Sequence, residues 1–234
     1  MPPTSATVLV TGASGNLGRA VARAFERNGA RLVLIDRRPE KLAVAFGGES
    51  AGRIFAIADL LDRAQVERAA RSAIERFGRI DVLCNIAGGF RMGPPVHETP
   101  DADWDFQFDV NLRTLLNAVR AVVPHMLAGG GGKIINVGAA SALKGAAGMG
   151  AYCAAKSAVI RVTESMAEEL RERNINVNCV LPTIIDTPEN RAAMPDADPA
   201  RWVAADDLAQ VFVFLASPEA RAIHGAAVPV PALS

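Results

Sequence analysis

Cysteine is scarce in this sequence, and its few positions form no pattern. The 234 residues include three cysteines, Cys84, Cys153 and Cys179. An odd number of cysteines without the spacing of metal ligands excludes a disulfide framework and is typical of buried free thiols. We therefore expect neither a disulfide nor a metal site.

Excess charge and long apolar runs are also lacking. Lysine and arginine together number 25, as do aspartate and glutamate, so the formal net charge is zero. This balance gives no electrostatic reason for binding nucleic acid or an anionic membrane surface. No apolar run reaches the length of a membrane span, and no basic segment precedes the first apolar run. We expect a cytoplasmic protein whose partners are a small-molecule substrate and further copies of the same chain.

Short apolar segments alternate with longer segments of helical periodicity. Apolar runs of this length are typical of strands buried on both faces of a sheet, and the helical segments between them allow right-handed crossovers. We predict an α/β protein with a single Rossmann-type, doubly wound parallel sheet flanked by helices, in one domain over residues 1–234. The predicted strands are 7–12, 31–36, 53–59, 81–88, 133–137, 175–181 and 226–230, and a long helix is predicted over about 103–127.

One segment near the end interrupts this alternation. Residues 187–205 are rich in proline, aspartate and arginine, which suits neither a long helix nor a strand. An insertion of this kind beside a doubly wound sheet is more often a substrate lid than a linker. We predict a lid here, with Trp202 either stacking on a flat substrate ring or closing the lid against the core.

A glycine-rich turn follows the first predicted strand. The segment T-G-A-S-G-N-L-G places Gly12, Gly15 and Gly18 between that strand and a helix. Backbone without side chains can approach a pyrophosphate closely, and a helix N-terminus supplies free N–H groups and a positive dipole end. The alternative is a tight turn without a ligand. The carboxylate at the end of the next strand makes this alternative less favoured.

Two carboxylates end the second and third predicted strands. Asp36 is placed to accept both hydroxyls of an adenosine ribose and would repel a 2′-phosphate. Asp59, followed by Leu60, would lie near the adenine amine. These positions predict NAD(H) as the preferred cofactor. Arg37 and Arg38 leave NADP(H) open, because a guanidinium can pair with a phosphate, although two solvated arginines are the simpler interpretation.

These motifs resemble the short-chain dehydrogenase/reductase family, and the resemblance covers nearly the whole chain. Five motifs in the family's order are far more specific than any one of them. They are T-G-x-x-x-G-x-G placed at 11–18, N-N-A-G altered to N-I-A-G at 85–88, the helix asparagine as Asn111 in DVNL, Y-x-x-x-K as Tyr152 with Lys156, and P-G-x-x-x-T altered to P-T-I-I-D-T at 182–187.

The resemblance implies a role for each matched residue. Tyr152 would be the general acid and base, because the Lys156 ammonium four residues along the same helix face is expected to lower the pKa of the tyrosine. Asn111 would steady a water for proton exchange. Tyr152 is the sole tyrosine of the chain, and the alternative is a core tyrosine anchored by its hydroxyl. The implied cofactor-binding residues are Gly12, Ser14, Gly15, Asn16, Leu17, Gly18, Asp36, Arg37, Asp59, Leu60, Asn85, Ala87, Gly88, Tyr152, Lys156, Pro182, Ile185 and Thr187.

The family usually has a serine after the fifth strand, which donates a hydrogen bond to the substrate carbonyl. Alignment without gaps places Ala139 there, and alanine cannot donate. Ser141 lies two residues further on, roughly 6.5 Å away in an extended chain, so it can substitute only if the loop bulges toward the substrate. A loop or helix-capping role for Ser141 is equally consistent with the sequence.

The dihydropteridine reductase subgroup of the family keeps the tyrosine and lysine without this serine. Segments 138–159 and 180–202 resemble that subgroup, and an electron-poor quinonoid ring needs less polarisation by a donor than a ketone does. The interpretation is hydride transfer to a pterin-like acceptor, with Ser141, Met149 and Trp202 as candidate substrate residues. Two alternatives remain: a general carbonyl or 3-oxoacyl reductase, and a dinucleotide-binding regulator with impaired catalysis. The family also implies a homodimer or homotetramer.

Overall fold

Seven parallel strands form one sheet, in the order β3-β2-β1-β4-β5-β6-β7. This computed structural model describes residues 5–234. The arrangement confirms the predicted doubly wound sheet. Its strands are β1 (Thr7–Thr11), β2 (Arg31–Asp36), β3 (Arg53–Ile57), β4 (Val82–Asn85), β5 (Gly132–Val137), β6 (Ile175–Pro182) and β7 (Ala227–Val230).

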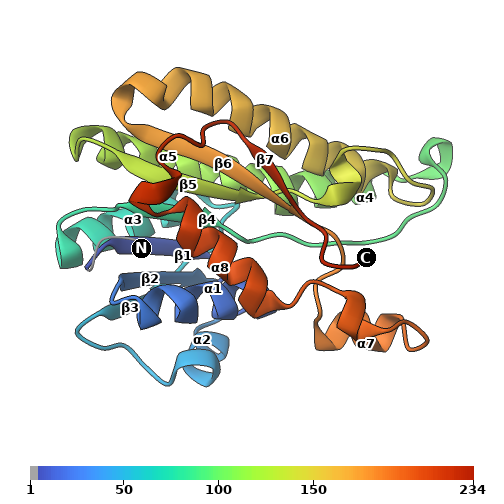
Figure 1. Cartoon of the computed structure of the whole chain (residues 1–234), viewed down its shortest axis with the longest axis horizontal. Helices are drawn as coiled ribbons and strands as arrows, with labels where there is room; N and C mark the ends of the chain where they lie inside the picture. The colour runs from blue at the N-terminus through green and yellow to red at the C-terminus, as the bar shows by residue number, and fades with distance from the viewer. Residues whose placement is uncertain (1–4) are drawn as a thin grey trace.

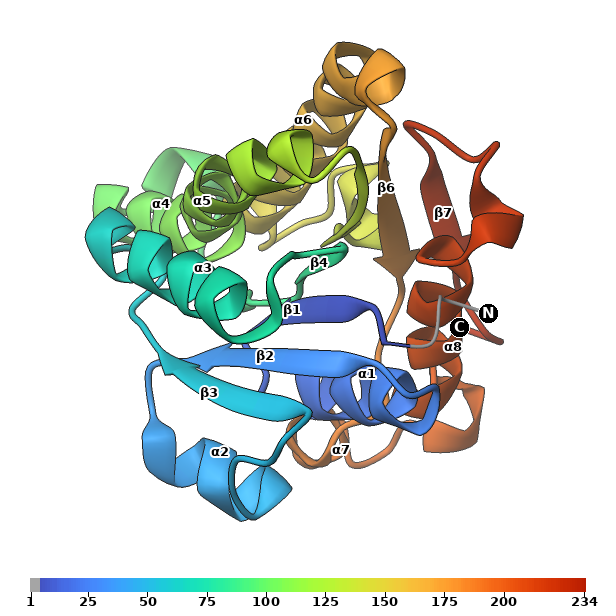
Figure 2. The same cartoon turned by 90° about the vertical axis from the view of Figure 1, so that its left-hand side faces the viewer.

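Helices cover both faces of the sheet (Figures 1 and 2). On one face lie α1 (Asn16–Arg27), α2 (Pro39–Phe46) and α8 (Ala205–Leu215), and on the other lie α3 (Arg63–Phe77), α5 (Thr114–Ala128) and α6 (Gly150–Leu170). Helix α2 was not predicted, because only Leu42 of its eight residues is buried and its apolar periodicity is weak. No helix in the described part of the chain is both long and apolar enough to cross a bilayer.

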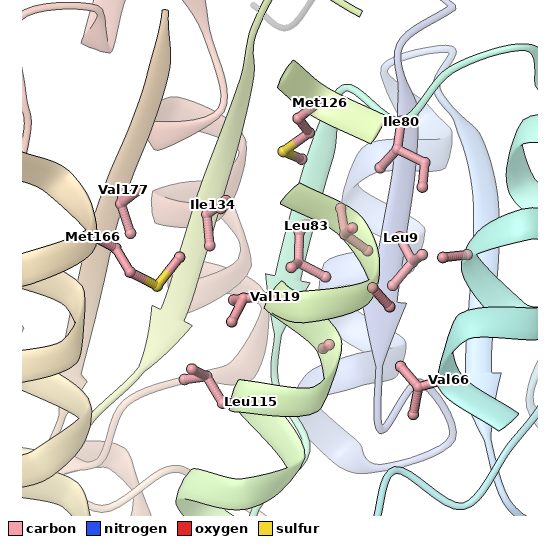
Figure 3. Packing of buried hydrophobic residues seen from close by; sticks show 14 of the residues in the cluster. Leu9, Val66, Ile80, Leu83, Leu115, Val119, Met126, Ile134, Met166 and Val177 are labelled. Carbon is pink, nitrogen blue, oxygen red and sulfur yellow. The ribbon is translucent and has the colours of Figure 1, made fainter. Parts of the chain in front are cut away.

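The apolar core holds the central strands in place beneath these helices. Figure 3 shows strand residues such as Leu9 and Leu83 facing Leu115, Val119 and Met126 of α5. The strands are apolar on both faces because helices cover both, and burial of this area stabilises the sheet by roughly 25 cal/mol per Å². The rigid core fixes the carboxyl edge of the sheet, from which the functional loops leave.

The predicted long helix is a continuous helical run that contains an irregular turn. Helix α4 (Asp101–Phe108) leads into a π-helical turn, Asp109–Arg113, and then into α5. Asn111 lies inside this turn. Insertions of this kind are frequent at functional sites, since they redirect side chains without ending the helix.

The segment predicted as a lid contains only short helical pieces. They are α7 (Pro188–Ala193) and a 3-10 turn, Pro199–Arg201. Thr187 caps α7 by accepting a hydrogen bond from the N–H of Asn190 at 3.1 Å, and Pro188 is pre-organised for the first helical position. These turns lead directly into α8, and α7 lies at the border of the molecule in Figure 1.

Candidate active site

A cleft of about 880 Å³ opens where the strand order reverses between β1 and β4. This is the position at which doubly wound sheets bind ligands. The lining comes from the glycine-rich turn and from the carboxyl ends of β2, β3 and β4. The predicted cofactor residues that line it are Gly12, Ser14, Gly15, Asn16, Leu17, Gly18, Asp36, Arg37, Asp59, Leu60, Ala87 and Gly88.

Crowding explains two of the glycines in the turn. Gly12 has φ +63°, and a Cβ there would lie 2.9 Å from the Cα of Ala87. A Cβ on Gly18 would lie 2.2 Å from the carbonyl oxygen of Gly12. Since such contacts are far inside van der Waals distance, only glycine permits this close approach of α1 to the turn.

The spacing of the turn differs from the family pattern in one place. The pattern has its middle glycine where this chain has Asn16, and Gly15 stands one residue earlier. The Asn16 side chain donates to Glu189 Oε2 at 2.7 Å and accepts from Arg19 at 2.6 Å. Asn16 therefore connects the glycine-rich turn to the first turn of α7, a contact that the sequence did not predict.

The N-terminus of α1 can receive an anion. Gly15 caps the helix without a side-chain hydrogen bond, and the first turn contains no acidic residue. The free N–H groups and the helix dipole there favour a phosphate group. The close backbone approach at Gly12 and the open helix end together fit a dinucleotide pyrophosphate.

The carboxylate of Asp36 is held at the edge of the cleft. Its Oδ2 accepts from the Ser14 hydroxyl at 2.6 Å, and its Oδ1 accepts from the N–H of Arg38 at 3.2 Å. Arg37 and Lys41 also line this part of the cleft. The carboxylate is placed to accept ribose hydroxyls, while the neighbouring cations are placed to meet a phosphate.

Thr11 was missed as a site residue by the sequence analysis. Its hydroxyl accepts from the N–H groups of Ile86 and Ala87, at 3.0 and 3.2 Å, and donates to the carbonyl of Cys84 at 3.4 Å. These bonds tie the end of β1 to the segment after β4 and so shape the cleft floor. A polar residue that ends an otherwise apolar strand is the signal that could have found it.

Helix α6 carries the tyrosine and the lysine on one face. Lys156 Nζ lies 6.0 Å from the centroid of the Tyr152 ring and donates to the carbonyl of Val137 at 2.9 Å. A Cβ on Gly88 would lie 3.4 Å from this Nζ and 3.0 Å from Asn111 Oδ1. Gly88 also lines the cleft. It is therefore the point at which the cleft meets Lys156 and Asn111.

The predicted lowering of the tyrosine pKa is wrong for this structure. Burial raises the pKa of the Tyr152 hydroxyl to about 12, and the neighbouring Cys153 adds to the rise. Burial also lowers the pKa of Lys156 to about 8. The Lys156 ammonium, 6.0 Å from the ring centroid and bonded to Val137, does not offset the loss of solvation by the phenolate.

Asn111 is buried and fully engaged with its neighbours. Its Oδ1 accepts from the N–H of Gly89 at 3.1 Å, and its Nδ2 donates to the carbonyl of Gly89 at 2.9 Å. The other hydrogen of Nδ2 is shared between the backbone oxygen and the side-chain oxygen of Gln107, both at 3.0 Å. The side chain thus anchors the loop after β4 in addition to any contact with water.

Asn85 does not reach the cleft, although it was predicted to bind cofactor. It donates to Asn136 Oδ1 at 2.9 Å across the β4–β5 pair, and Asn136 donates to Thr163 at 2.8 Å. The three residues form a buried polar chain between the sheet and α6. Asn85 is the last residue of β4, and its bond to Asn136 holds the amide against the sheet and out of the cleft lining.

The remaining predicted residues are spread along the site. Pro182 is the last residue of β6, and Ile185 and Thr187 follow that strand. None of the three lines the cleft, and the carbonyl of Ile185 accepts from Asn190 at 2.8 Å. Met149 and Tyr152 line a second, much smaller cavity. Ser141 lies in a 3-10 turn after β5 and lines neither cavity. Trp202 is buried and also lines neither, which favours packing over substrate stacking.

Across residues 5–234, no group of three or more histidine, cysteine or acidic residues could hold a metal ion. The three cysteines are buried free thiols, as expected. Burial alone raises the pKa of the Cys84 thiol, which keeps it protonated and unreactive.

The short-chain dehydrogenase family model matches residues 6–198. The chain belongs to this family. It is 35% identical over 230 residues to the D-threitol dehydrogenase of Mycolicibacterium smegmatis, covering 93% of this chain and 88% of that protein. Family membership makes the chain an NAD(P)-dependent oxidoreductase of the short-chain type.

Two solved structures of the family are similar along their whole length. The carveol dehydrogenase of Mycobacterium avium, in complex with NAD, has a TM-score of 0.89 and 28% identity, over 99% of this chain and 98% of that chain. The L-sorbose reductase of Gluconobacter frateurii, with NADPH and L-sorbose, has a TM-score of 0.89 and 27% identity, over 99% and 97%. The resemblance to the dihydropteridine reductase subgroup stays a prediction.

Proposed function

We propose that this short-chain oxidoreductase transfers hydride between a nicotinamide and a carbonyl or conjugated, pterin-like substrate, with Tyr152 as acid and base. One observation carries the proposal. Gly88 lines the dinucleotide cleft. It lies so close to Lys156 and Asn111 that a Cβ built on it would be 3.4 Å from Lys156 Nζ and 3.0 Å from Asn111 Oδ1. The end of the cleft therefore opens directly onto the helix that carries Tyr152.

The bound cofactor supplies or accepts the hydride, and the side chains handle the proton. A tyrosine with a pKa of about 12 is protonated at neutral pH. It suits the donor role, in which the Tyr152 proton goes to substrate oxygen or nitrogen as hydride reaches the neighbouring atom. Lys156 is proposed to hold the nicotinamide ribose. Ile185 and Thr187, at the start of the lid, are proposed to bind the carboxamide.

NAD(H) is the proposed preferred cofactor. Asp36 sits at the edge of the cleft with its carboxylate fixed by Ser14, so a 2′-phosphate would meet a negative charge there. The positive charges of Arg37 and Lys41 beside it partly offset the repulsion of a 2′-phosphate by Asp36, so NADP(H) is proposed as a weaker alternative.

Ala139 supports a conjugated acceptor over a simple ketone. It is 6% exposed and cannot donate a hydrogen bond, while Ser141 lines neither cavity. A ring that is already electron-poor depends less on a donor at this position. We therefore expect Ala139→Ser to change turnover of a quinonoid dihydropterin by less than about threefold, and a large gain would contradict the pterin proposal.

A polyol or ketose substrate is the competing proposal. The similarity to a threitol dehydrogenase and to a sorbose reductase favours it. A reaction on such a substrate requires a water or Ser141 to replace the missing donor. A binding-only protein is the third alternative, and the intact Tyr152 and Lys156 pair argues against it.

The deciding experiment measures NADH oxidation with quinonoid dihydropterin, L-sorbose, acetoacetyl-CoA and a simple diketone, together with NAD reduction by D-threitol. Turnover of the pterin with weak turnover of the others supports the pterin proposal. Turnover of sorbose or threitol alone supports the competing one. Tyr152→Phe should abolish turnover in either case, and the variant should still bind NADH. Unchanged turnover in that variant would overturn the proposed role of Tyr152.

We also propose a homodimer or homotetramer, assembled through α5 and α6. Both helices keep partly buried apolar side chains beside the core, among them Leu116, Val123 and Val162. Light scattering after size-exclusion chromatography measures the assembly directly, and a monomer at micromolar concentration would refute it.

A further inference from the structure

The ring of Phe90 contacts the ring of Tyr152. The two centroids lie 4.9 Å apart with an interplanar angle of 81°, which is an edge-to-face arrangement. Phe90 is 53% exposed, so much of its ring surface stays open beside the tyrosine. This surface adds apolar area at the place where a substrate must approach the Tyr152 hydroxyl.

The backbone on both sides of Phe90 is anchored. Asn111 binds the N–H and the carbonyl of Gly89, as described above, and Gln107 donates to the carbonyl of Arg91 at 3.0 Å. Asn111 and Gln107 are also bonded to each other. The two amides therefore hold the backbone of the segment that carries Phe90.

A second loop closes this side of the site with further apolar groups. The N–H of Gly93 donates to the carbonyl of Gly148 at 2.9 Å, and a Cβ on Gly148 would lie 3.1 Å from Met92 Cε. Met92 is 62% exposed and lines the small cavity that Tyr152 and Met149 also line. The apolar side chains of Phe90, Met92 and Met149 therefore lie around the tyrosine on this side.

Recognition in this site cannot use the hydroxyl that the family usually places opposite the tyrosine, because Ala139 stands there. We propose that Phe90 is a specificity-determining residue, whose exposed ring packs against a flat, conjugated substrate and sets it beside the Tyr152 hydroxyl. This inference rests on the proposed function of the Tyr152 site. It identifies ring shape, rather than polar anchoring, as the basis of substrate choice.

The test is calorimetric titration of biopterin into the protein saturated with NAD⁺. NAD⁺ has no hydride to give, so binding is measured without any reaction. Biopterin should bind the wild type, and Phe90→Leu, which keeps apolar volume but lacks a flat ring, should weaken binding about tenfold, or about 1.4 kcal/mol. Phe90→Trp should restore affinity to within about twofold of the wild type.

The matched control is Phe214→Ala. Phe214 is 47% exposed and lies on α8, which covers the opposite face of the sheet from α6. This variant should bind biopterin like the wild type. Equal binding by the wild type and Phe90→Leu, or absence of biopterin binding by the wild type, overturns the inference. Failure of the proposed function would appear separately, as binding that depends on Phe90 without turnover of any substrate.

Discussion

The side chain of Asn111 holds both backbone polar groups of Gly89, accepting from its N–H at 3.1 Å and donating to its carbonyl at 2.9 Å. Asn111 lies in the π-helical turn between α4 and α5, where the helix is already distorted. One buried amide therefore fixes the loop that follows β4 and borders the site.

Replacement of this amide should affect both stability and activity. Asn111→Ala leaves the polar groups of Gly89 and the oxygens of Gln107 without their partner, so we expect a loss of about 1–3 kcal/mol in the free energy of unfolding. The displaced loop should lower kcat/KM at least about tenfold. Urea unfolding and steady-state kinetics measure the two effects.

A control for this prediction is Asn178→Ala. Asn178 is also buried, and it donates to the carbonyl of Ile223 and accepts from the N–H of Ala226, in the connection that leads to β7. A similar loss of stability is expected, with kcat/KM within about threefold of the wild type. Equal losses of activity in the two variants would show that Asn111 acts through stability alone.

The crowding at Gly18 predicts a strong effect of one methyl group. Gly18→Ala would place Cβ 2.2 Å from the carbonyl oxygen of Gly12, so the turn and α1 must move apart. We expect a destabilisation of about 2 kcal/mol or more and a loss of NADH affinity of at least about tenfold. Gly52→Ala is the control, because nothing lies within 4 Å of its Cβ position. NADH affinity equal in both variants would contradict this account of the turn.

The carboxylate of Asp36 predicts how cofactor choice can be changed. Asp36→Ser removes the charge that would face a 2′-phosphate and leaves Arg37 and Lys41 beside the cleft. The ratio of kcat/KM for NADPH over NADH should rise at least about tenfold. Asp59→Asn also removes a carboxylate from the cleft, but in the loop after β3, so it should leave the ratio within about threefold. An unchanged ratio in Asp36→Ser would show that this carboxylate does not set the preference.

The buried ammonium of Lys156 predicts a dependence of stability on pH. Burial lowers its pKa from 10.5 to about 8 in the folded protein. Below pH 8 the charged group is present in both states and its burial destabilises the fold. Between about pH 8 and 10.5 the folded protein has lost this proton while the unfolded chain retains it, so the free energy of unfolding rises with pH.

The measurement compares urea unfolding of the wild type and Lys156→Met at pH 7.5 and pH 9. The contribution of Lys156 over this interval should be about 1 kcal/mol, and the variant should lack it. Burial raises the pKa of Cys84 and also that of Cys179, to about 11 for Cys179 beside Lys156, so both thiols stay protonated in the folded wild type over this interval. Lys144→Met, on the surface loop before α6, should retain the wild-type dependence. An identical dependence in Lys156→Met would refute the lowered pKa.

The layers of the fold and the place of the dinucleotide cleft follow from the order of apolar and helical segments along the chain. Alternating apolar segments and helices leave few arrangements other than a doubly wound parallel sheet, and carboxyl ends of parallel strands meet at one edge. Gly12 and Asp36 could therefore be placed in the cleft from their positions after β1 and at the end of β2. The family motifs added Tyr152, Lys156 and Asn111.

The neighbours of these residues depend on how segments far apart in the chain pack together. Burial raises the pKa of Tyr152 although a lysine lies on the same helix face, because the phenolate loses solvation. The extent of that burial depends on tertiary packing, which the Y-x-x-x-K spacing does not reveal. Asn85 bonds across the sheet to Asn136 instead of reaching the cleft. The edge-to-face contact between Phe90 and Tyr152 joins residues 62 positions apart, and only the folded chain brings them together.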